Sequence, residues 1–256
     1  FAVFELGLLN LKCHLIDNLD KIGGQCSELY PEKPIYDIPA YPKITGQELT
    51  DKLMLQIKPF EPTFHLNQQA EKIKKIENGW ELTTSNNVVI CSKCIVIAAG
   101  AGSFVPRRPP LANIEKYEGK SIFYAIREKS KFKNKKILIV GGGDSALDWT
   151  NDLASIADVT LMHRRKDFRA APDSVSKMLD LEKERKINFK LGQLTELDGV
   201  NGNLKKVKYK YDDQEKIIDV DYLIPFFGLK MELGPIANWG INLNENRIKV
   251  DTEKFE

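Results

Sequence analysis

The sequence predicts an α/β protein with a parallel β-sheet, because short apolar runs alternate with segments of helical periodicity. The clearest run, Lys136–Val140 (KILIV), is typical of a strand that is buried on both faces. A helical pattern over 144–156 follows it directly, and a second apolar run, DVTLMHR, covers 158–164. This order predicts a βαβ unit. A weaker α/β pattern opens the chain, with a helical stretch over 1–9 before the strand KCHLID at 12–17.

Composition excludes several classes of protein. The 256 residues include 38 Lys+Arg and 36 Asp+Glu, a formal charge of +2, which disfavours nucleic-acid binding through bulk positive charge. The longest apolar stretch, 88–105, is interrupted by Ser92 and Lys93, so we expect no transmembrane span. The first residues, FAVFELGLLN, lack the basic region and cleavage site of a signal peptide. Four cysteines are too few for a disulfide scaffold, which favours the reducing cytoplasm.

Further elements are expected on either side of the central unit. Helices should begin at the capping box of Thr45 and Glu48 and at Pro172, and run to about 58 and 186. Strands are expected at 70–76, 80–84, 94–99, 187–191 and 204–211, the last one antiparallel and half solvated. Three prolines break the pattern between about 106 and 119, which predicts a domain boundary there.

A dinucleotide fingerprint of the form GxGxxA lies between the central strand and its helix. Its first glycine allows a tight turn, its second lets a pyrophosphate approach the backbone, and Ala146 lets the helix pack on the strand. Phosphates would lie at the positive end of the helix. The alternative is a structural turn without a ligand. The candidate contact residues are Gly141, Gly142, Gly143, Asp144 and Ser145.

The end of the next strand indicates which nucleotide is bound. An acidic residue there would accept a hydrogen bond from a ribose 2′-hydroxyl, whereas this sequence has His163, Arg164 and Arg165, followed by Arg169. Guanidinium groups suit a dianionic phosphate and match the bare hydroxyls of NAD poorly. The sequence therefore predicts NADPH over NADH. The alternative is an arginine cluster that only solvates the strand end.

The segments GGGDSALDW and HRRKDFRA, together with IDNLDKIGGQCSELYPEKPIYDIPAYPKI upstream, resemble the ferredoxin–NADP reductases of the thioredoxin-reductase-like type. The resemblance covers nearly the whole chain. It implies two nested dinucleotide-binding domains, Rossmann-like and three-layered, with the FAD domain split by an inserted NADPH domain. The implied boundaries are 1–113 for the first part of the FAD-binding domain, 114–229 for the NADPH-binding domain and 230–256 for the return to the FAD-binding domain. The implied cofactors are FAD and NADPH.

The resemblance also implies residues that contact FAD. Asp17 ends the first strand, where a carboxylate can accept hydrogen bonds from the adenosine ribose; a capping or surface aspartate is the alternative. Gly24 and Gln25 belong to the segment that wraps the FAD phosphates and ribityl chain. Tyr30 matches the tyrosine that stacks on the isoalloxazine ring, although by itself it reads as a core aromatic. Asp37 matches an aspartate close to the flavin.

Two more positions follow from the same resemblance. Ala70 opens a strand where a small residue lets the adenine meet the backbone, and Phe104 lies on the turn that passes the cofactor. Members of the family begin with a strand and a GxGxxG loop for FAD, and end with an AxGD segment and a helix. Neither is present here, so we expect a fragment of a longer reductase whose FAD site is incomplete.

The resemblance implies a flavoprotein in which NADPH delivers hydride to flavin N5 and electrons then pass one at a time to ferredoxin or a flavodoxin-like carrier. No protein acid or base is needed for hydride transfer, so no catalytic residue is predicted. Family members imply a homodimer for the full-length enzyme. Six lysines, at positions 120, 129, 131, 133, 135 and 136, either face an acidic partner or form ordinary surface.

Two alternatives compete with this function. One is a non-catalytic NADPH-binding fragment. The other is a thioredoxin-reductase-like disulfide reductase, which needs a CxxC just before the strand at 136, where this sequence has no cysteine. Cys91 and Cys94 are three apart at the start of an expected strand, where their side chains would point to opposite faces. No second ligand pair accompanies them, so no metal site is predicted.

Overall fold

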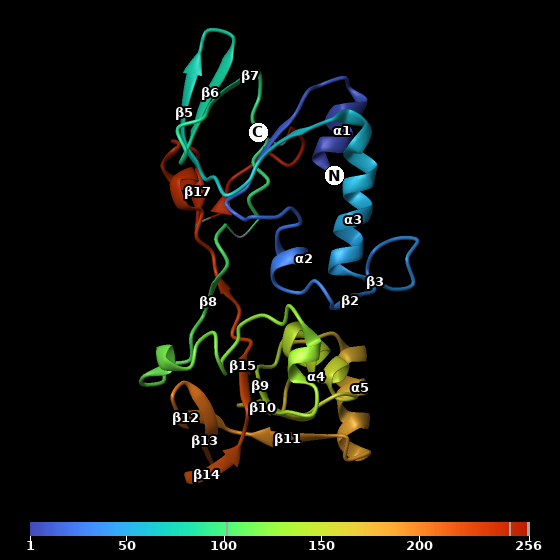
Figure 1. The fold of residues 1–256 in the computed structure, drawn as a ribbon, viewed down its shortest axis with the longest axis vertical. Coiled ribbons are helices and arrows are strands. Elements are labelled where there is room, and N and C mark those ends of the chain that lie inside the picture. Colours follow the sequence, from blue (N-terminus) through green and yellow to red (C-terminus); the bar gives the residue numbers. More distant parts are fainter. Residues whose placement is uncertain (101, 246, 255–256) are drawn as a thin grey trace. The chain divides into compact units, whose positions relative to one another are not determined.

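The computed structural model describes residues 1–100, 102–245 and 247–254, which form two compact units (Figure 1). Unit 1 comprises 1–27, 47–105 and 229–256, and unit 2 comprises 28–46 and 106–228. The chain thus leaves unit 1 twice and returns to it twice. None of the helices in the described residues is long and apolar enough to cross a membrane.

Unit 2 is built on a four-stranded parallel sheet in the order β11-β10-β9-β15. Its strands are β9 (Lys136–Val140), β10 (Asp158–His163), β11 (Ile187–Leu191) and β15 (Tyr222–Pro225). Helix α4 (Asp144–Leu153) connects β9 to β10, and α5 (Pro172–Lys183) connects β10 to β11. The order in which the chain adds strands reverses at β9, which has β10 on one side and the later strand β15 on the other. The carboxyl end of β9 is therefore the switch point at which α/β sheets bind ligands.

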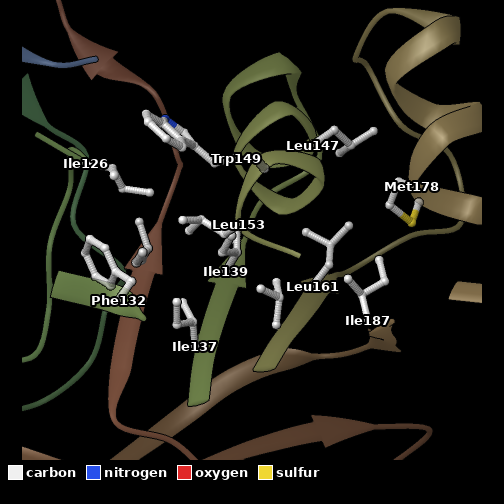
Figure 2. Packing of buried hydrophobic residues seen from close by; sticks show 13 residues of the cluster. Ile126, Phe132, Ile137, Ile139, Leu147, Trp149, Leu153, Leu161, Met178 and Ile187 are labelled. Atoms are coloured by element: carbon white, nitrogen blue, oxygen red, sulfur yellow. The ribbon is translucent and has the colours of Figure 1, made fainter. Parts of the chain in front are cut away.

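The helical face of this sheet forms the first core cluster (Figure 2). Residues spaced along one side of α4, Trp149 and Leu153 among them, are almost completely buried, as the helical periodicity predicts. They face Ile137 and Ile139 of β9, which alternate along the strand. Met178 of α5 extends the same cluster over β10 and β11.

An antiparallel three-stranded sheet packs against the parallel sheet and forms the second core cluster with it. It consists of β12 (Gln193–Val200), β13 (Asn203–Tyr211) and β14 (Gln214–Asp219). Leu138 of β9 points to this cluster, together with Leu204 and Val207 of β13. The lysines of β13 are largely solvated, as its alternation predicts. Helices, parallel sheet and antiparallel sheet make three layers, as in the predicted fold class.

The remaining elements of unit 2 are short. The segment 28–46 contributes the strand pair β2 (Pro34–Ile35) and β3 (Ile44–Thr45). The 3₁₀ turns η2 (Ile114–Lys116) and η3 (Lys129–Phe132) precede β9.

Unit 1 contains the helices α1 (Ala2–Leu8) and α3 (Gly46–Ile57, which starts at the unit boundary) and the short turn η1 (Lys58–Phe60). Strands β1 (His14–Ile16) and β4 (Thr63–His65) pair in parallel, whereas β5 (Ala70–Ile76), β6 (Gly79–Thr84) and β7 (Val89–Ser92) form an antiparallel sheet. The four-residue helix α2 (Gln25–Glu28) spans a unit boundary.

The returning segment of unit 1 begins with β16 (Leu229–Lys230), which pairs with β8 (Val105–Pro106). It continues through η4 (Gly234–Asn238), β17 (Leu243–Asn244) and β18 (Arg247–Ile248). The indole N–H of Trp239 donates to the carbonyl oxygen of Glu71 in β5 at 3.1 Å. This bond fastens the returning segment to the antiparallel sheet of the same unit.

The strand expected at 94–99 is wrong. The edge of β6 is paired by Val89–Ser92 instead, and 94–99 lies outside the named strands. Val96 is 57% exposed and Ile97 is 37% exposed, although both are strong strand formers. Strand formation needs a hydrogen-bonded neighbour as well as apolar side chains, and the sequence does not reveal which run takes the edge of β6.

We predict that Leu153→Ala lowers the free energy of unfolding of unit 2 by about 2–5 kcal/mol, because it leaves a cavity in the first core cluster. Urea denaturation followed by circular dichroism measures this loss. Leu179→Ala in α5 is the matched control, since Leu179 is 38% exposed and should cost much less. Equal losses for the two variants would contradict the packing described.

Candidate nucleotide-binding site

The first glycine of the turn after β9 is required by the fold itself. A Cβ atom on Gly141 would lie 2.8 Å from the carbonyl oxygen of Phe226 and 3.0 Å from Cβ of Ala146. The Gly141 N–H also donates to the carbonyl oxygen of Met162 at 3.1 Å. Gly141 and the fully buried Ala146 therefore let the helix begin directly against the sheet, as the fingerprint predicts.

At Gly143, no contact within the described chain requires a glycine. Its φ of −104° and ψ of 179° are extended values that any residue adopts. A Cβ atom there would have no described heavy atom within 4 Å beyond its chain neighbours. The space lies beside the start of α4, where no side chain caps the helix and the first N–H groups lack intrahelical acceptors. Open space beside free N–H groups is the geometry that accepts a phosphate.

Gly142 contacts the side chain that ends β10. A Cβ atom on Gly142 would lie 2.4 Å from two atoms of the His163 ring, so only glycine leaves room for the imidazole. The ring of His163 stacks on Phe168, with centroids 5.4 Å apart and an interplanar angle of 25°. The imidazole is thus held between the glycine turn and the loop that follows its own strand.

The surroundings of His163 favour the neutral form of its imidazole. Burial lowers the pKa of its imidazole below the ordinary value of 6.5, and the charges of Arg164, Arg165 and Arg169 lower it further. A neutral imidazole adds no proton charge of its own to an already cationic site.

Two hydrogen bonds fasten the arginine-bearing loop to the glycine turn. The Arg169 N–H donates to the carbonyl oxygen of Gly142 at 2.7 Å, and the Ala171 N–H donates to Oδ1 of Asp144 at 2.8 Å. Asp144, a predicted contact residue, therefore has one carboxylate oxygen engaged in holding the loop. Ser145 is exposed in the first turn of α4.

The loop side chains are free to bind an anion. Arg164, Arg165 and Arg169 are exposed, and none of them forms an ion pair with another described residue. Sequence reasoning missed Phe168 and Ala171, which position this loop through ring stacking and a backbone N–H. The aromatic residue within RKDFRA was the available signal for the first; no signal marks the second.

The residues predicted to contact FAD fall into both units. Asp17 follows β1, and its Oδ1 accepts from the Leu19 N–H at 3.1 Å. Gly24 adopts a φ of +54°, and a Cβ atom there would meet no described heavy atom within 4 Å. Gln25 begins α2 and Ala70 begins β5. Phe104 is half-buried just before β8. All five belong to unit 1.

Tyr30 and Asp37, by contrast, belong to unit 2. The Lys33 ammonium lies 2.5 Å from a carboxylate oxygen of Asp148, which fixes segment 28–46 to helix α4. Tyr30 packs against the first core cluster, whereas Asp37 is exposed. The sequence did not reveal this attachment, because the contact joins residues more than a hundred positions apart.

Comparison with known proteins shows which family this chain resembles. The family model described as "Pyridine nucleotide-disulphide oxidoreductase" matches residues 3–254. A "Ferredoxin--NADP reductase" from Parvibaculum lavamentivorans is 58% identical over 259 residues, covering 100% of this chain and 76% of the relative. One from Bradyrhizobium sp. (strain BTAi1) is 56% identical with the same coverage.

Solved structures with the same fold include two thioredoxin reductases. The enzyme of T. acidophilum superposes with a TM-score of 0.83 at 20% identity, covering 98% of this chain and 80% of that one. The enzyme of Lactococcus lactis gives 0.83 at 23% identity with the same coverage. Both likenesses show the fold alone.

The chain therefore belongs to the pyridine nucleotide-disulphide oxidoreductase family. Within it, the relatives at 54–58% identity carry the name ferredoxin–NADP reductase, which confirms the resemblance drawn from the sequence. The predicted fold class is confirmed as well.

We predict that Gly143→Ala leaves thermal stability unchanged but weakens NADPH binding at least about tenfold, because its methyl group enters the space open to the pyrophosphate. Thermal unfolding and titration of NADPH by calorimetry measure the two effects. Gly142→Ala is the contrasting variant, since it collides with His163 and should lower stability by about 1–3 kcal/mol. Wild-type affinity in Gly143→Ala would show that the space serves another purpose.

Proposed function

We propose that this chain forms the cofactor-binding domains of a ferredoxin–NADP reductase, a flavoprotein that takes electrons from NADPH. The observation that carries the proposal concerns Gly143. Neither its backbone conformation nor its packing requires a glycine, but the missing side chain leaves room beside the uncapped N-terminus of α4. The family membership and the names of its relatives agree with it.

The residues of unit 2 fit NADPH. The N–H groups at Gly143, Asp144 and Ser145 would hold the pyrophosphate at the positive end of α4, with Gly141 and Gly142 shaping the turn. Arg164, Arg165 and Arg169 would hold the 2′-phosphate, because paired guanidinium forks match a dianion. The His163 ring, which packs between Gly142 and Phe168, would position the arginine-bearing loop.

We assign 114–229 to the NADPH-binding domain and 1–113 with 230–256 to the FAD-binding domain. The change of unit at Gly228–Leu229 supports the second boundary. The first part of the FAD-binding domain includes 28–46, which packs with unit 2. This segment carries Tyr30 and Asp37, the two predicted flavin contacts that belong to unit 2.

Unit 1 carries the other residues predicted to contact FAD. The open space at Gly24 fits a phosphate or ribityl chain, and the free lone pairs of the Asp17 carboxylate fit a ribose hydroxyl. Gln25, Ala70 and Phe104 would line the same cofactor.

With both cofactors bound, NADPH would supply hydride and FAD would supply the ability to pass on the two electrons singly. The chain itself needs no acid or base for this chemistry. Its side chains bind and orient the cofactors: guanidinium groups select the nucleotide, glycines admit its phosphates, and Tyr30 offers an aromatic face. We propose ferredoxin or a flavodoxin-like protein as the acceptor, a homodimer as the full-length assembly and the cytoplasm as the location.

A disulfide reductase is disfavoured by the cysteines. None of the four cysteines forms a disulfide in the described part of the chain, and both Cys91 and Cys94 are exposed. The stretch 120–136 before β9 contains none. A purified full-length enzyme that bleaches its flavin absorbance on addition of NADPH would support the proposal, whereas nucleotide binding by a colourless protein would indicate a non-catalytic binding module.

We predict that Arg164→Ala combined with Arg165→Ala weakens NADPH binding by about 10- to 100-fold, because one or two charge-assisted hydrogen bonds to the 2′-phosphate are lost. NADH, which lacks that phosphate, should bind the double variant as it binds the wild type. Calorimetric titration of both nucleotides measures the difference. Arg185→Ala, at the end of α5, is the control. Equal losses for the two nucleotides would remove the argument for NADPH.

A further inference from the structure

We propose that the basic side chains of η3 and its flanks, the exposed Lys131, Lys133 and Lys135 with Arg127 and the half-buried Lys129, form a docking surface for an acidic electron-carrier protein. We call this set the lysine surface. The inference rests on the proposed function, because it supplies the site at which the one-electron acceptor binds.

Positive charge is concentrated there. Segment 127–136 contains six basic side chains and one acidic side chain, a net charge of +5, whereas the whole chain carries only +2. The rest of the chain is therefore net negative. An acidic protein that approaches the molecule is attracted to this segment and repelled on average elsewhere, which is how charge distribution selects an encounter surface.

The charges at the centre of the lysine surface are not neutralised by the protein. Arg127 pairs with Glu28, and the Lys129 ammonium lies 3.0 Å from a carboxylate oxygen of Asp152. In contrast, Lys131, Lys133 and Lys135 are exposed, and among the described residues none of the three forms an ion pair.

Lys131 also has a defined position. Its Nζ lies 3.8 Å from the ring centroid of Phe123, within cation–π distance. Phe123 in turn contacts Phe132 and Tyr222, with centroid separations of 6.1 and 5.8 Å. The ammonium therefore rests on an aromatic group that joins the first core cluster, and it keeps its charge while losing part of its freedom.

The lysine surface is separate from the nucleotide turn. Turn η3 lies before β9 and the glycine turn lies after it, and a five-residue strand spans about 16 Å. A carrier bound at the amino end of β9 would leave Gly143 and the arginine loop accessible to NADPH.

The surface is, however, directly connected to the segment proposed to hold the flavin. The Arg127 side chain donates from Nε to the carbonyl oxygen of Glu28 at 2.9 Å, and the Lys129 N–H donates to Oε2 of Glu32 at 2.7 Å. Tyr30, the proposed flavin-stacking residue, lies between these two contacts in sequence. Docking on the lysine surface would bring an acidic carrier next to the segment that carries Tyr30.

The number of electrons transferred favours a short-lived complex between the enzyme and its carrier, formed by attraction between opposite charges. Oxidation of one NADPH to NADP⁺ releases a proton and two electrons, so two one-electron carriers must each bind, be reduced and leave. Exposed lysines raise the association rate without holding the product tightly, and salt screens their effect.

The test uses the full-length, flavin-loaded enzyme with an acidic [2Fe–2S] ferredoxin as the probe and menadione as an uncharged small acceptor. For Lys131→Gln, Lys133→Gln and Lys135→Gln combined, we expect the KM for ferredoxin at low salt to rise about tenfold, with kcat unchanged. Menadione reduction and the KM for NADPH should stay at wild-type values. Replacing the same three lysines by arginine should restore the wild-type KM for ferredoxin.

The matched control neutralises three lysines of the antiparallel sheet in unit 2: Lys205, Lys206 and Lys216, the last of which also lies over an aromatic ring. An unchanged ferredoxin KM in this control supports the assignment. An unchanged KM in the Lys131/Lys133/Lys135 variant, or an equal rise in the control, would overturn it. If the wild-type enzyme reduces neither ferredoxin nor menadione with NADPH, the proposed function itself fails, and the docking surface with it.

Discussion

The close approach of the glycine turn to the end of β10 is the constraint on which the site depends. Strand β9 delivers its chain directly into α4, and the turn between them has the His163 ring against Gly142 on one side and Phe226 against Gly141 on the other. Side chains at these two positions would push the helix start away from the sheet. Because they are absent, the free N–H groups of α4 open onto the switch point of the parallel sheet.

This constraint also places the arginines. The loop after β10 is held back on the turn by the carbonyl oxygen of Gly142 and the carboxylate of Asp144, so its guanidinium groups stay near the phosphate-binding space. The neutral His163 ring fills the gap between turn and loop. Unlike a Cβ atom at Gly141 or Gly142, one at Gly143 would meet no described heavy atom within 4 Å, so the glycine at this position supports a bound ligand.

The sequence predicted what local patterns determine. Strands β9, β10 and β11 and the starts of α4 and α5 lie where periodicity and the GxGxxA spacing place them, because each depends on residues close together in the chain. The strand expected at 94–99 was wrong because pairing depends on a neighbour that the run itself does not specify. The loop-holding role of Asp144 and the attachment of 28–46 through Lys33 and Asp148 depend on residues 27 and 115 positions apart, respectively, and leave no local signal.

A crystal structure of the flavin-loaded enzyme with NADP⁺ tests this view of the site most directly. It should show the pyrophosphate within hydrogen-bonding distance of the N–H groups at Gly143 and Asp144, in the space where a Cβ at position 143 would lie. The 2′-phosphate should contact the guanidinium groups of Arg164 and Arg165. A pyrophosphate bound away from the start of α4, or a 2′-phosphate left in solvent, would contradict it.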